Sequence, residues 1–155
     1  MLASRKIAAA LLAVLLALTA LAGCSRGENG RVTDVASAAQ TVRINGVIAD
    51  TVEAQSGAFE GKQGDTIEFE FAEPEEFNTV FIIEKTTTVR QFNIYAKVDG
   101  MYQLVYTGKR IVSENCVFDT VKATALKVEI LNTEIGDDHF IIQGISAYKL
   151  GEETT

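Results

Sequence analysis

"VRQFNIYAKVDGMYQLVYTG" (residues 89–108) is the stretch that decides the fold. Apolar and polar residues alternate on both sides of Asp99-Gly100, and this dipeptide is the strongest short signal for a two-residue hairpin turn. The residues of one parity are Phe92, Ile94, Ala96 and Val98 before the turn, and Tyr102, Leu104 and Tyr106 after it. The stretch therefore predicts two antiparallel strands, and it carries no obvious chemistry of its own.

The segments on either side of this hairpin continue the β pattern. "DTIEFEF" (65–71) alternates strictly, whereas "FNTVFIIE" (77–84) is apolar on both parities, as a central strand should be. Between them, "AEPEE" (72–76) holds the only proline and predicts a turn. Further strands are predicted at 115–119, 125–131 and 140–150, and Asn45-Gly46 predicts another hairpin. Many short strands without sustained helical spacing predict an all-β fold, an antiparallel β-sandwich of the jelly-roll type.

The N-terminal segment has the pattern of an export signal. Arg5 and Lys6 precede an uncharged apolar run over residues 7–23, which is close to the shortest length that spans a membrane as a helix. The run ends in Leu-Ala-Gly-Cys, which resembles the bacterial lipoprotein box, in which Cys24 is diacylated and becomes the first residue of the mature chain. An uncleaved anchor helix is the alternative. Either way, the chain is expected to be held to a membrane of the bacterial cell envelope, with its domain outside the cytoplasm.

These signals predict four segments: a signal peptide at 1–23, the lipidated cysteine and a tether at 24–38, a sandwich domain at 39–150, and a tail at 151–155. Removal of the signal peptide leaves 12 basic and 21 acidic residues, a net charge of −9. So acidic a chain is not expected to bind nucleic acid, or to bind anionic membrane by charge. Cys116 has no partner in the mature chain, and we expect it to be a buried free thiol.

From Gly64 to Leu150 the chain resembles the discoidin, or coagulation factor type C, domain, a galactose-binding-like jelly roll that includes family 32 carbohydrate-binding modules. The likeness rests on "DTIEFEFAEPEEFNTVFIIE", on the hairpin "VRQFNIYAKVDGMYQLVYTG" and on "VKATALKVEIL". In the hairpin, Tyr102 stands where the family usually has tryptophan. The chain is especially similar to the modules appended to secreted glycosidases such as fucosidases. The resemblance implies a sandwich whose loops bind a cell-surface or environmental glycan.

The chain departs from this family at the positions that bind ligands. It has no tryptophan for sugar stacking, and "KTTTV" (85–89) lacks the arginine and asparagine that galactose-binding members carry in a longer loop. Only Asn45, Asp50 and Thr51 hint at the aspartate-rich stretch that helps to form a structural calcium site, and Gln143 stands where the family often has glutamate. We expect no cofactor and no metal site, while a structural calcium ion stays open.

The order of the strands suggests where a ligand would bind. If successive strands reverse direction, the connections "KTTT" (85–88), "GKRIVSE" (108–114) and "NTEIGDDH" (132–139) meet at one end of the domain, and binding residues concentrate on such loops. The candidate ligand-binding residues there are Lys85, Lys109, Arg110, Glu114, Asp137 and His139. Ordinary solvated loop tips would have the same composition.

No catalytic motif accompanies these residues. The chain has one histidine, and neither a nucleophile elbow, a zinc-protease motif nor a phosphate-binding glycine loop is present. We therefore predict a surface lipoprotein with a non-catalytic carbohydrate-binding module, which is not an enzyme. The main alternative is a structural or interaction lipoprotein whose sandwich docks another envelope protein and binds no sugar.

Overall fold

The computed structural model describes residues 32–151. The predicted signal peptide, Cys24 and the last four residues lie outside this range, so the structure does not bear on the predicted lipid anchor. Among the described residues, no helix is long and apolar enough to cross a membrane.

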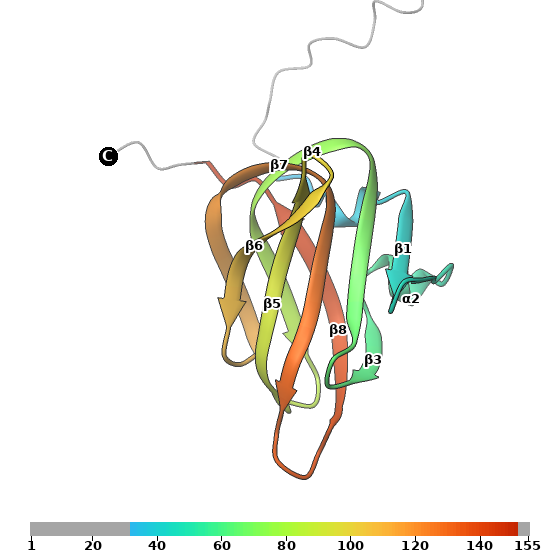
Figure 1. Cartoon of the computed structure of the whole chain (residues 1–155), viewed down its shortest axis with the longest axis vertical. Helices are drawn as coiled ribbons and strands as arrows, with labels where there is room; N and C mark the ends of the chain where they lie inside the picture. Colours follow the sequence, from blue (N-terminus) through green and yellow to red (C-terminus); the bar gives the residue numbers. More distant parts are fainter. Residues whose placement is uncertain (1–31, 152–155) are drawn as a thin grey trace, which may run out of the picture. The chain divides into compact units, whose positions relative to one another are not determined.

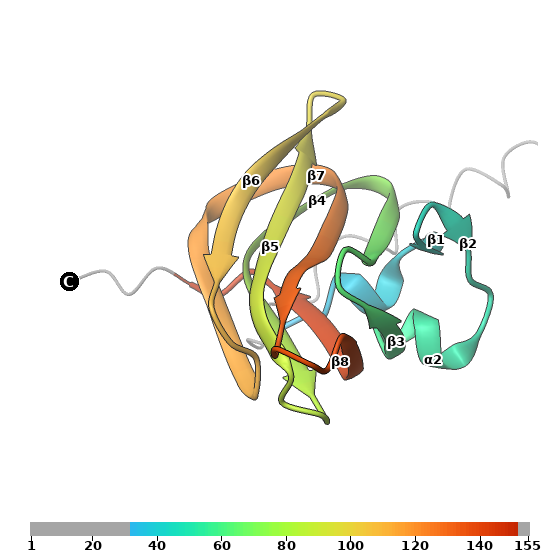
Figure 2. The same cartoon turned by 60° about the horizontal axis from the view of Figure 1, so that its bottom comes forward.

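The described chain is a β-sandwich, as predicted (Figures 1 and 2). Its strands are β1 (Thr41–Ile44), β2 (Val47–Ile48), β3 (Phe59–Lys62), β4 (Thr66–Glu84), β5 (Val89–Val98), β6 (Met101–Gly108), β7 (Ser113–Thr133) and β8 (His139–Tyr148). Two short helical turns, η1 (Ala36–Ala38) and α2 (Val52–Gln55), complete it. The first sheet has the order β2-β1-β4-β7-β5-β6, and β8, with β3 beside it, pairs with the second half of β4 to make the second sheet. All strand pairs are antiparallel.

Two long strands, β4 and β7, run through both sheets, and here the predicted turn at 72–76 is wrong. The two strands expected on either side of it form one strand of 19 residues. The register against β7 shifts between Glu70 and Glu75, so this segment is a bulge at which the strand bends over the end of the sandwich (Figure 1). Pro74 is tolerated there because a bulge leaves residues out of the hydrogen-bonded ladder. The two strands predicted at 115–119 and 125–131 likewise belong to β7.

The hairpin at Asp99-Gly100 joins β5 to β6, but its second strand does not keep one parity. Asp99 and Gly100 have φ of 50° and 80°, as a tight hairpin turn requires. A register shift beyond Ile94 then separates the tyrosines of β6. Tyr106 packs against Phe92 in the core, whereas Tyr102 lies on the outer face, where Lys127 Nζ stands 4.1 Å from its ring centre. The expectation of one face for both tyrosines is therefore wrong.

The core lies between the sheets and consists of the inward residues of their strands. The apolar residues that the sequence places on one face of each of these strands are buried, for example Ile67 and Phe69 in β4 and Val128 and Ile130 in β7. Cys116 is fully buried and unpaired, as predicted, and its burial raises the thiol pKa to about 12. At neutral pH it is therefore a packing residue and a poor nucleophile.

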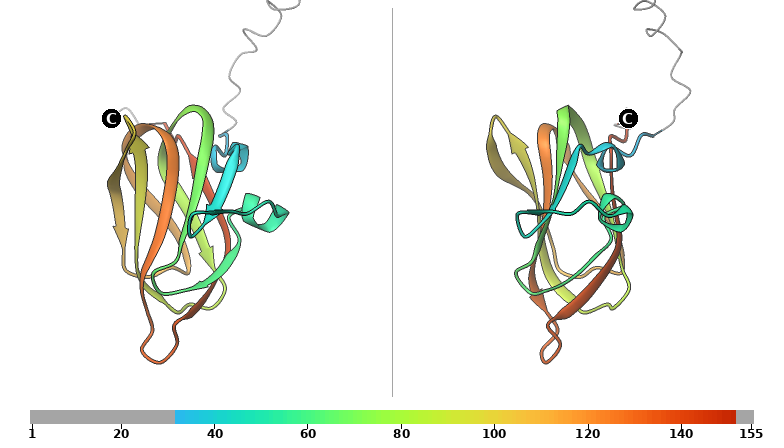
Figure 3. Two further views of the ribbon diagram at one scale, coloured as in Figure 1. Left: turned by 45° about the vertical axis from the view of Figure 1, so that its right-hand side comes forward. Right: turned by 90° about the vertical axis from the view of Figure 1, so that its right-hand side faces the viewer.

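The folded domain reaches back to Asp34, before the expected start at residue 39. The Asp34 Oδ1 accepts hydrogen bonds from the N–H groups of Ala36 (3.0 Å) and Ala147 (2.9 Å), and Val35 N–H donates to Ala147 O (2.9 Å). Val35 and Ala36 are buried in the core. These contacts attach the start of the described chain beside the last residues of β8, at the end of the sandwich where β4 and β7 bend (Figure 3).

Candidate functional site

Three connections meet at the end of the sandwich opposite the bends, and we call this the loop end: residues 85–88, 109–112 and 134–138 (Figures 1 and 3). Main-chain hydrogen bonds tie them together. Lys85 N–H donates to Ile141 O at 2.8 Å, Glu134 N–H to Thr88 O at 2.8 Å, and Glu84 N–H to Val112 O at 3.2 Å. The expectation that these connections share one end is confirmed.

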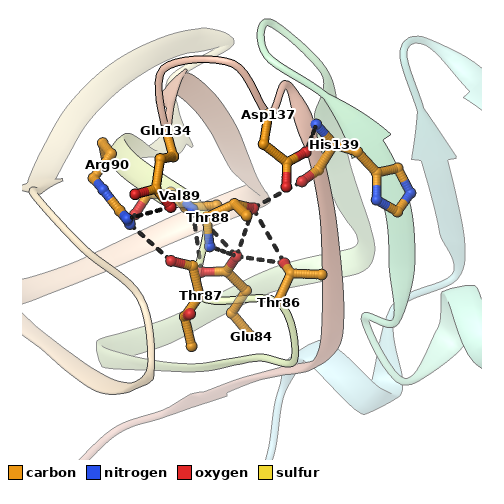
Figure 4. Close-up of polar contacts among 9 residues, drawn as sticks. All are labelled: Glu84, Thr86, Thr87, Thr88, Val89, Arg90, Glu134, Asp137 and His139. Carbon is orange, nitrogen blue, oxygen red and sulfur yellow. Dashed lines mark hydrogen bonds and ion pairs between the residues drawn. The ribbon is translucent and has the colours of Figure 1, made fainter.

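A buried carboxylate organises the first of these connections (Figure 4). The Glu84 side chain is only 4% exposed, yet it has no cationic partner within ion-pair distance among residues 32–151. Its Oε1 instead accepts hydrogen bonds from Thr86 Oγ1 (2.6 Å), Thr88 N–H (2.6 Å), Thr88 Oγ1 (3.1 Å) and Val89 N–H (3.2 Å). A carboxylate surrounded by donors is stable without a counter-ion, and it fixes the conformation of the loop.

Arg90 links this connection to the β7–β8 loop. Its Nη1 donates to Thr87 O at 2.7 Å, and its Nη2 lies 2.8 Å from the Glu134 carboxylate (Figure 4). Thr88 Oγ1 also lies 2.8 Å from His139 O, so its single hydroxyl proton is shared between this carbonyl and Glu84 Oε1. Thr86 Oγ1 accepts from Ile141 N–H at 3.1 Å. The loop end is therefore a connected polar network held on rigid strands, which suits a binding surface that must keep its shape.

A shallow depression of about 420 Å³ lies beside this network. It is lined by Gln63, Asn132, Thr133 and the β7–β8 loop from Glu134 to Asp138. The lining offers amide donors and acceptors, hydroxyl and carboxylate groups, and the fully exposed Ile135 side chain at the tip of the loop. Such a surface could hydrogen-bond the hydroxyls of a small polar ligand, but the depression has no aromatic platform.

The six residues predicted for a ligand all lie at the loop end, but they do not converge on one point. The basic residues Lys85, Lys109 and Arg110 are exposed on neighbouring connections. Asp137 lines the depression, where its Oδ1 accepts His139 N–H at 3.2 Å. His139 turns its ring towards β3, with Nε2 3.6 Å from the Glu60 carboxylate and away from the Glu84 network (Figure 4). Glu114 pairs with Ile82 on the inward side of β7, near Tyr106.

Sequence reasoning missed the residues that hold the loops in place, namely Glu84, Thr88 and Arg90. A glutamate at the end of an apolar strand, followed by three threonines, was the available signal, because hydroxyl and main-chain donors must come from such a segment if the carboxylate is buried. Arg90 gave no such signal, because Glu134 lies 44 residues away in the sequence.

Asn45 and Thr51, two of the residues that hinted at a calcium site, lie within the described part of the chain. Among residues 32–151, no three histidine, cysteine or acidic side chains are arranged to hold a metal ion. Two of the residues that hinted at calcium have local structural roles: Asn45 Oδ1 accepts Thr66 N–H at 2.9 Å, and Thr51 caps α2 by accepting Ala54 N–H at 3.1 Å.

Solved structures of carbohydrate-binding modules share this architecture, although no known family model and no curated protein matches the chain. A family 32 carbohydrate-binding module from C. perfringens NanJ, solved with galactose, superposes with a TM-score of 0.60 at 13% identity, over 77% of this chain and 100% of the module. The domain has the discoidin-like, or galactose-binding-like, fold. The predicted resemblance is thus confirmed at the level of the fold.

Two further structures, one of an isolated module and one of a whole enzyme, show how much of each the discoidin-like domain covers. Chitosan-binding module 1 of a Paenibacillus sp. IK-5 chitosanase/glucanase gives a TM-score of 0.62 at 14% identity, over 75% of this chain and 98% of the module. A putative α-L-fucosidase from Bacteroides ovatus gives 0.56 at 24% identity, over 64% of this chain. This chain spans only 18% of the fucosidase. The discoidin-like domain therefore corresponds to a module and not to the whole enzyme.

Proposed function

We propose that this protein is a lipid-anchored surface protein whose discoidin-like domain is a non-catalytic carbohydrate-binding module, with its ligand site at the loop end. The observation that carries the proposal is the polar network centred on Glu84 and Arg90, which fixes the β4–β5 and β7–β8 loops beside a depression on one end of a rigid sandwich. Loops held by a scaffold are the usual place for recognition. The modules of this fold that bind galactose and chitosan lend support.

Several carboxylates of the loop end are already engaged, which supports a binding role over hydrolysis. Glu84 accepts hydrogen bonds from its own loop and Glu134 is paired with Arg90. In the β3–β4 turn, which borders the loop end, Asp65 Oδ2 accepts Lys62 N–H at 2.8 Å. Glycoside hydrolysis needs two carboxyl groups facing each other across a substrate, one as acid and one as base or nucleophile. Carboxylates held in structural hydrogen bonds are poorly placed for proton transfer.

The attachment of the N-terminal segment supports the proposed anchor. Asp34 and Val35 are bound to Ala147 at the bend end, so a chain arriving from Cys24 would join the domain at the end away from the loops. A lipid on Cys24 would then leave the loop end free for a ligand. Stable anchoring takes two acyl chains, which a diacylated cysteine provides.

If Cys24 is lipidated, substitution of Cys24, but not of Cys116, should prevent fatty-acid attachment. Cys24→Ala should abolish the incorporation of a labelled fatty-acid analogue in bacteria that express the full chain, because no other residue then carries the lipoprotein box. Cys116→Ala is the matched control and should be labelled normally, since Cys116 is buried in the domain. Equal labelling of Cys24→Ala and the parent would contradict the anchor.

Glycan binding should be weak and confined to the loop end. Without an aromatic platform, we expect dissociation constants of roughly high micromolar to millimolar, about −4 to −6 kcal/mol. Asp138→Ala or Arg110→Ala should weaken binding by at least about tenfold, because a hydrogen bond to a charged group contributes about 1.5–3 kcal/mol. The measurement is a glycan array with the purified full-length protein in mild detergent, followed by titration of each ligand that it identifies.

Glu73→Ala is the control, because Glu73 is exposed at the bend end and should not affect binding. If Glu73→Ala weakened binding as much as Asp138→Ala, the assignment of the site to the loop end would be wrong. Failure of every glycan on a broad array would overturn the carbohydrate-binding function and favour the docking alternative.

One observation supports that alternative, in which the domain docks another envelope protein. The outward residues of the second sheet carry no charge along the rows where β7, β4 and β8 pair: Val117, Thr79 and Tyr148 in one row, Asn115, Phe81 and Ser146 in the next, and Ser113, Ile83 and Gly144 in the third. Val117 is 63% exposed. An uncharged face that carries exposed Val117 and half-buried Phe81 and Ile83 is cheaper to desolvate against a protein partner than the charged outer face of the first sheet.

A further inference from the structure

The cations of this acidic domain are unevenly distributed. Residues 32–151 contain ten lysines and arginines. Arg43, Arg90 and Lys149 form ion pairs with carboxylates, and Lys97 and Lys127 lie over tyrosine rings. The remaining five, which have no such partner among the described residues, are Lys62, Lys85, Lys109, Arg110 and Lys122. Four of these five lie at the loop end or on the strand end that borders it, and only Lys122 lies near the bends.

Three of these cations form what we call the basic corner: Lys85, Lys109 and Arg110. They belong to the β4–β5 and β6–β7 connections, which are joined by the hydrogen bond from Glu84 N–H to Val112 O. All three side chains are exposed and make no hydrogen bond within residues 32–151. Between Glu84 and Glu114 the sequence has one acidic residue, Asp99, which is in the hairpin turn at the opposite end.

The acidic groups closest to the basic corner in the sequence are directed elsewhere. The Glu84 carboxylate points into its own loop, where it accepts hydrogen bonds from Thr86 and Thr88. Glu114 is half-buried on the inward side of β7, where it faces Tyr106 and contributes to raising the pKa of that phenol, after burial and Cys116. Glu134 is paired with Arg90. The positive charge of the corner is therefore not neutralised by any of these three carboxylates.

We propose that the basic corner binds the carboxylate of an acidic sugar, so that the glycan recognised by this domain contains uronic acid. This inference rests on the proposed carbohydrate-binding function and specifies its ligand class. The Arg110 guanidinium offers a planar pair of N–H donors that matches a carboxylate, and the two lysines add point charges on the same connection and on the one joined to it. The rest of the domain is strongly acidic and repels a polyanion, so an anionic chain is steered to this corner.

The test compares two polymers with one backbone. In the fully methyl-esterified form of polygalacturonate each carboxylate is a neutral methyl ester, and binding of the acid and the ester to the purified full-length protein in detergent is measured by calorimetry at low salt. We expect the acid form to bind at least tenfold more tightly than the ester. The preference should fall below threefold in the variant that carries Lys109→Gln and Arg110→Gln, and it should also fall when the salt concentration is raised to 0.5 M, because exposed charges are screened.

Lys122→Gln is the matched control, since Lys122 is an exposed cation near the bend end. It should keep the full preference, and circular dichroism should show that all variants are folded. Equal binding of acid and ester, or binding of neutral glycans alone, would overturn the acidic-sugar inference and leave the carbohydrate-binding function standing. No binding to any glycan, charged or neutral, would overturn both.

Discussion

Glu84→Ala should lower the free energy of unfolding by about 3–5 kcal/mol. The substitution leaves the N–H groups of Thr88 and Val89 without their acceptor, and both residues are buried. Each unsatisfied buried donor costs about 1–3 kcal/mol, and the loss of bonds to a charged acceptor adds to this. Urea denaturation, followed by far-ultraviolet circular dichroism, measures the effect.

Two variants make this result specific. Glu84→Gln keeps an acceptor oxygen but not the charge, so it should cost only about 1–2 kcal/mol. Glu73→Ala removes an exposed carboxylate from the bend end and should change stability by less than about 0.5 kcal/mol. If Glu84→Ala were no more costly than Glu73→Ala, the carboxylate would not organise the loop. Because the β4–β5 connection is part of the proposed site, Glu84→Ala should also weaken glycan binding in the protein that remains folded.

Gly57→Ala should cost about 2–4 kcal/mol, for two reasons that act together. Gly57 follows α2 with a φ of +79°, a conformation that is strained for alanine. A Cβ at this position would also lie 2.5 Å from Ile145 N and 2.6 Å from Ile145 Cβ. These atoms belong to β8, which cannot move without losing the hydrogen bond from Ile145 N–H to Ser56 O. Overpacking against a rigid strand adds about 1–3 kcal/mol to the backbone strain.

Gly46→Ala separates the two contributions. Gly46 has a nearly identical φ of +78° in the β1–β2 hairpin, but nothing lies within 4 Å of the position that a Cβ would occupy there. Its substitution should therefore cost only the backbone strain, about 1 kcal/mol. Measured by thermal and urea denaturation, the free energies of unfolding of Gly57→Ala and Gly46→Ala should differ by about 2 kcal/mol. Equal costs would show that α2 moves away from β8 without penalty.

The sequence was sufficient for the fold because sandwich strands are specified locally. Alternation with a period of two places Ile67 and Phe69 on the inward face whatever the rest of the chain does, and Asp99-Gly100 closes a hairpin through its own backbone angles. Reversal of successive strands then sorts the connections to two ends. That reasoning located the loop end correctly without any knowledge of which side chains meet there.

Local patterns could not distinguish a turn from a bend. The segment 72–76 has the composition of a turn, but β7 continues beside it, so the strand bends and goes on. The same limit applies to Tyr102 and Tyr106, because the register shift that separates them arises from pairing with β5. Bulges depend on the partner strand, and the partner is distant in the sequence.

The sequence by itself therefore determined the all-β class, the inward faces of the strands and the end of the domain where the variable loops gather. Only the tertiary structure decided what each polar side chain at that end does. It buries Glu84 among the threonines of its own loop, pairs Arg90 with Glu134, turns His139 towards Glu60, and leaves Lys85, Lys109 and Arg110 exposed. The physical reason is that strand periodicity is a property of neighbouring residues, whereas ion pairs and hydrogen bonds depend on which distant segments the sheets bring within about 3 Å of each other.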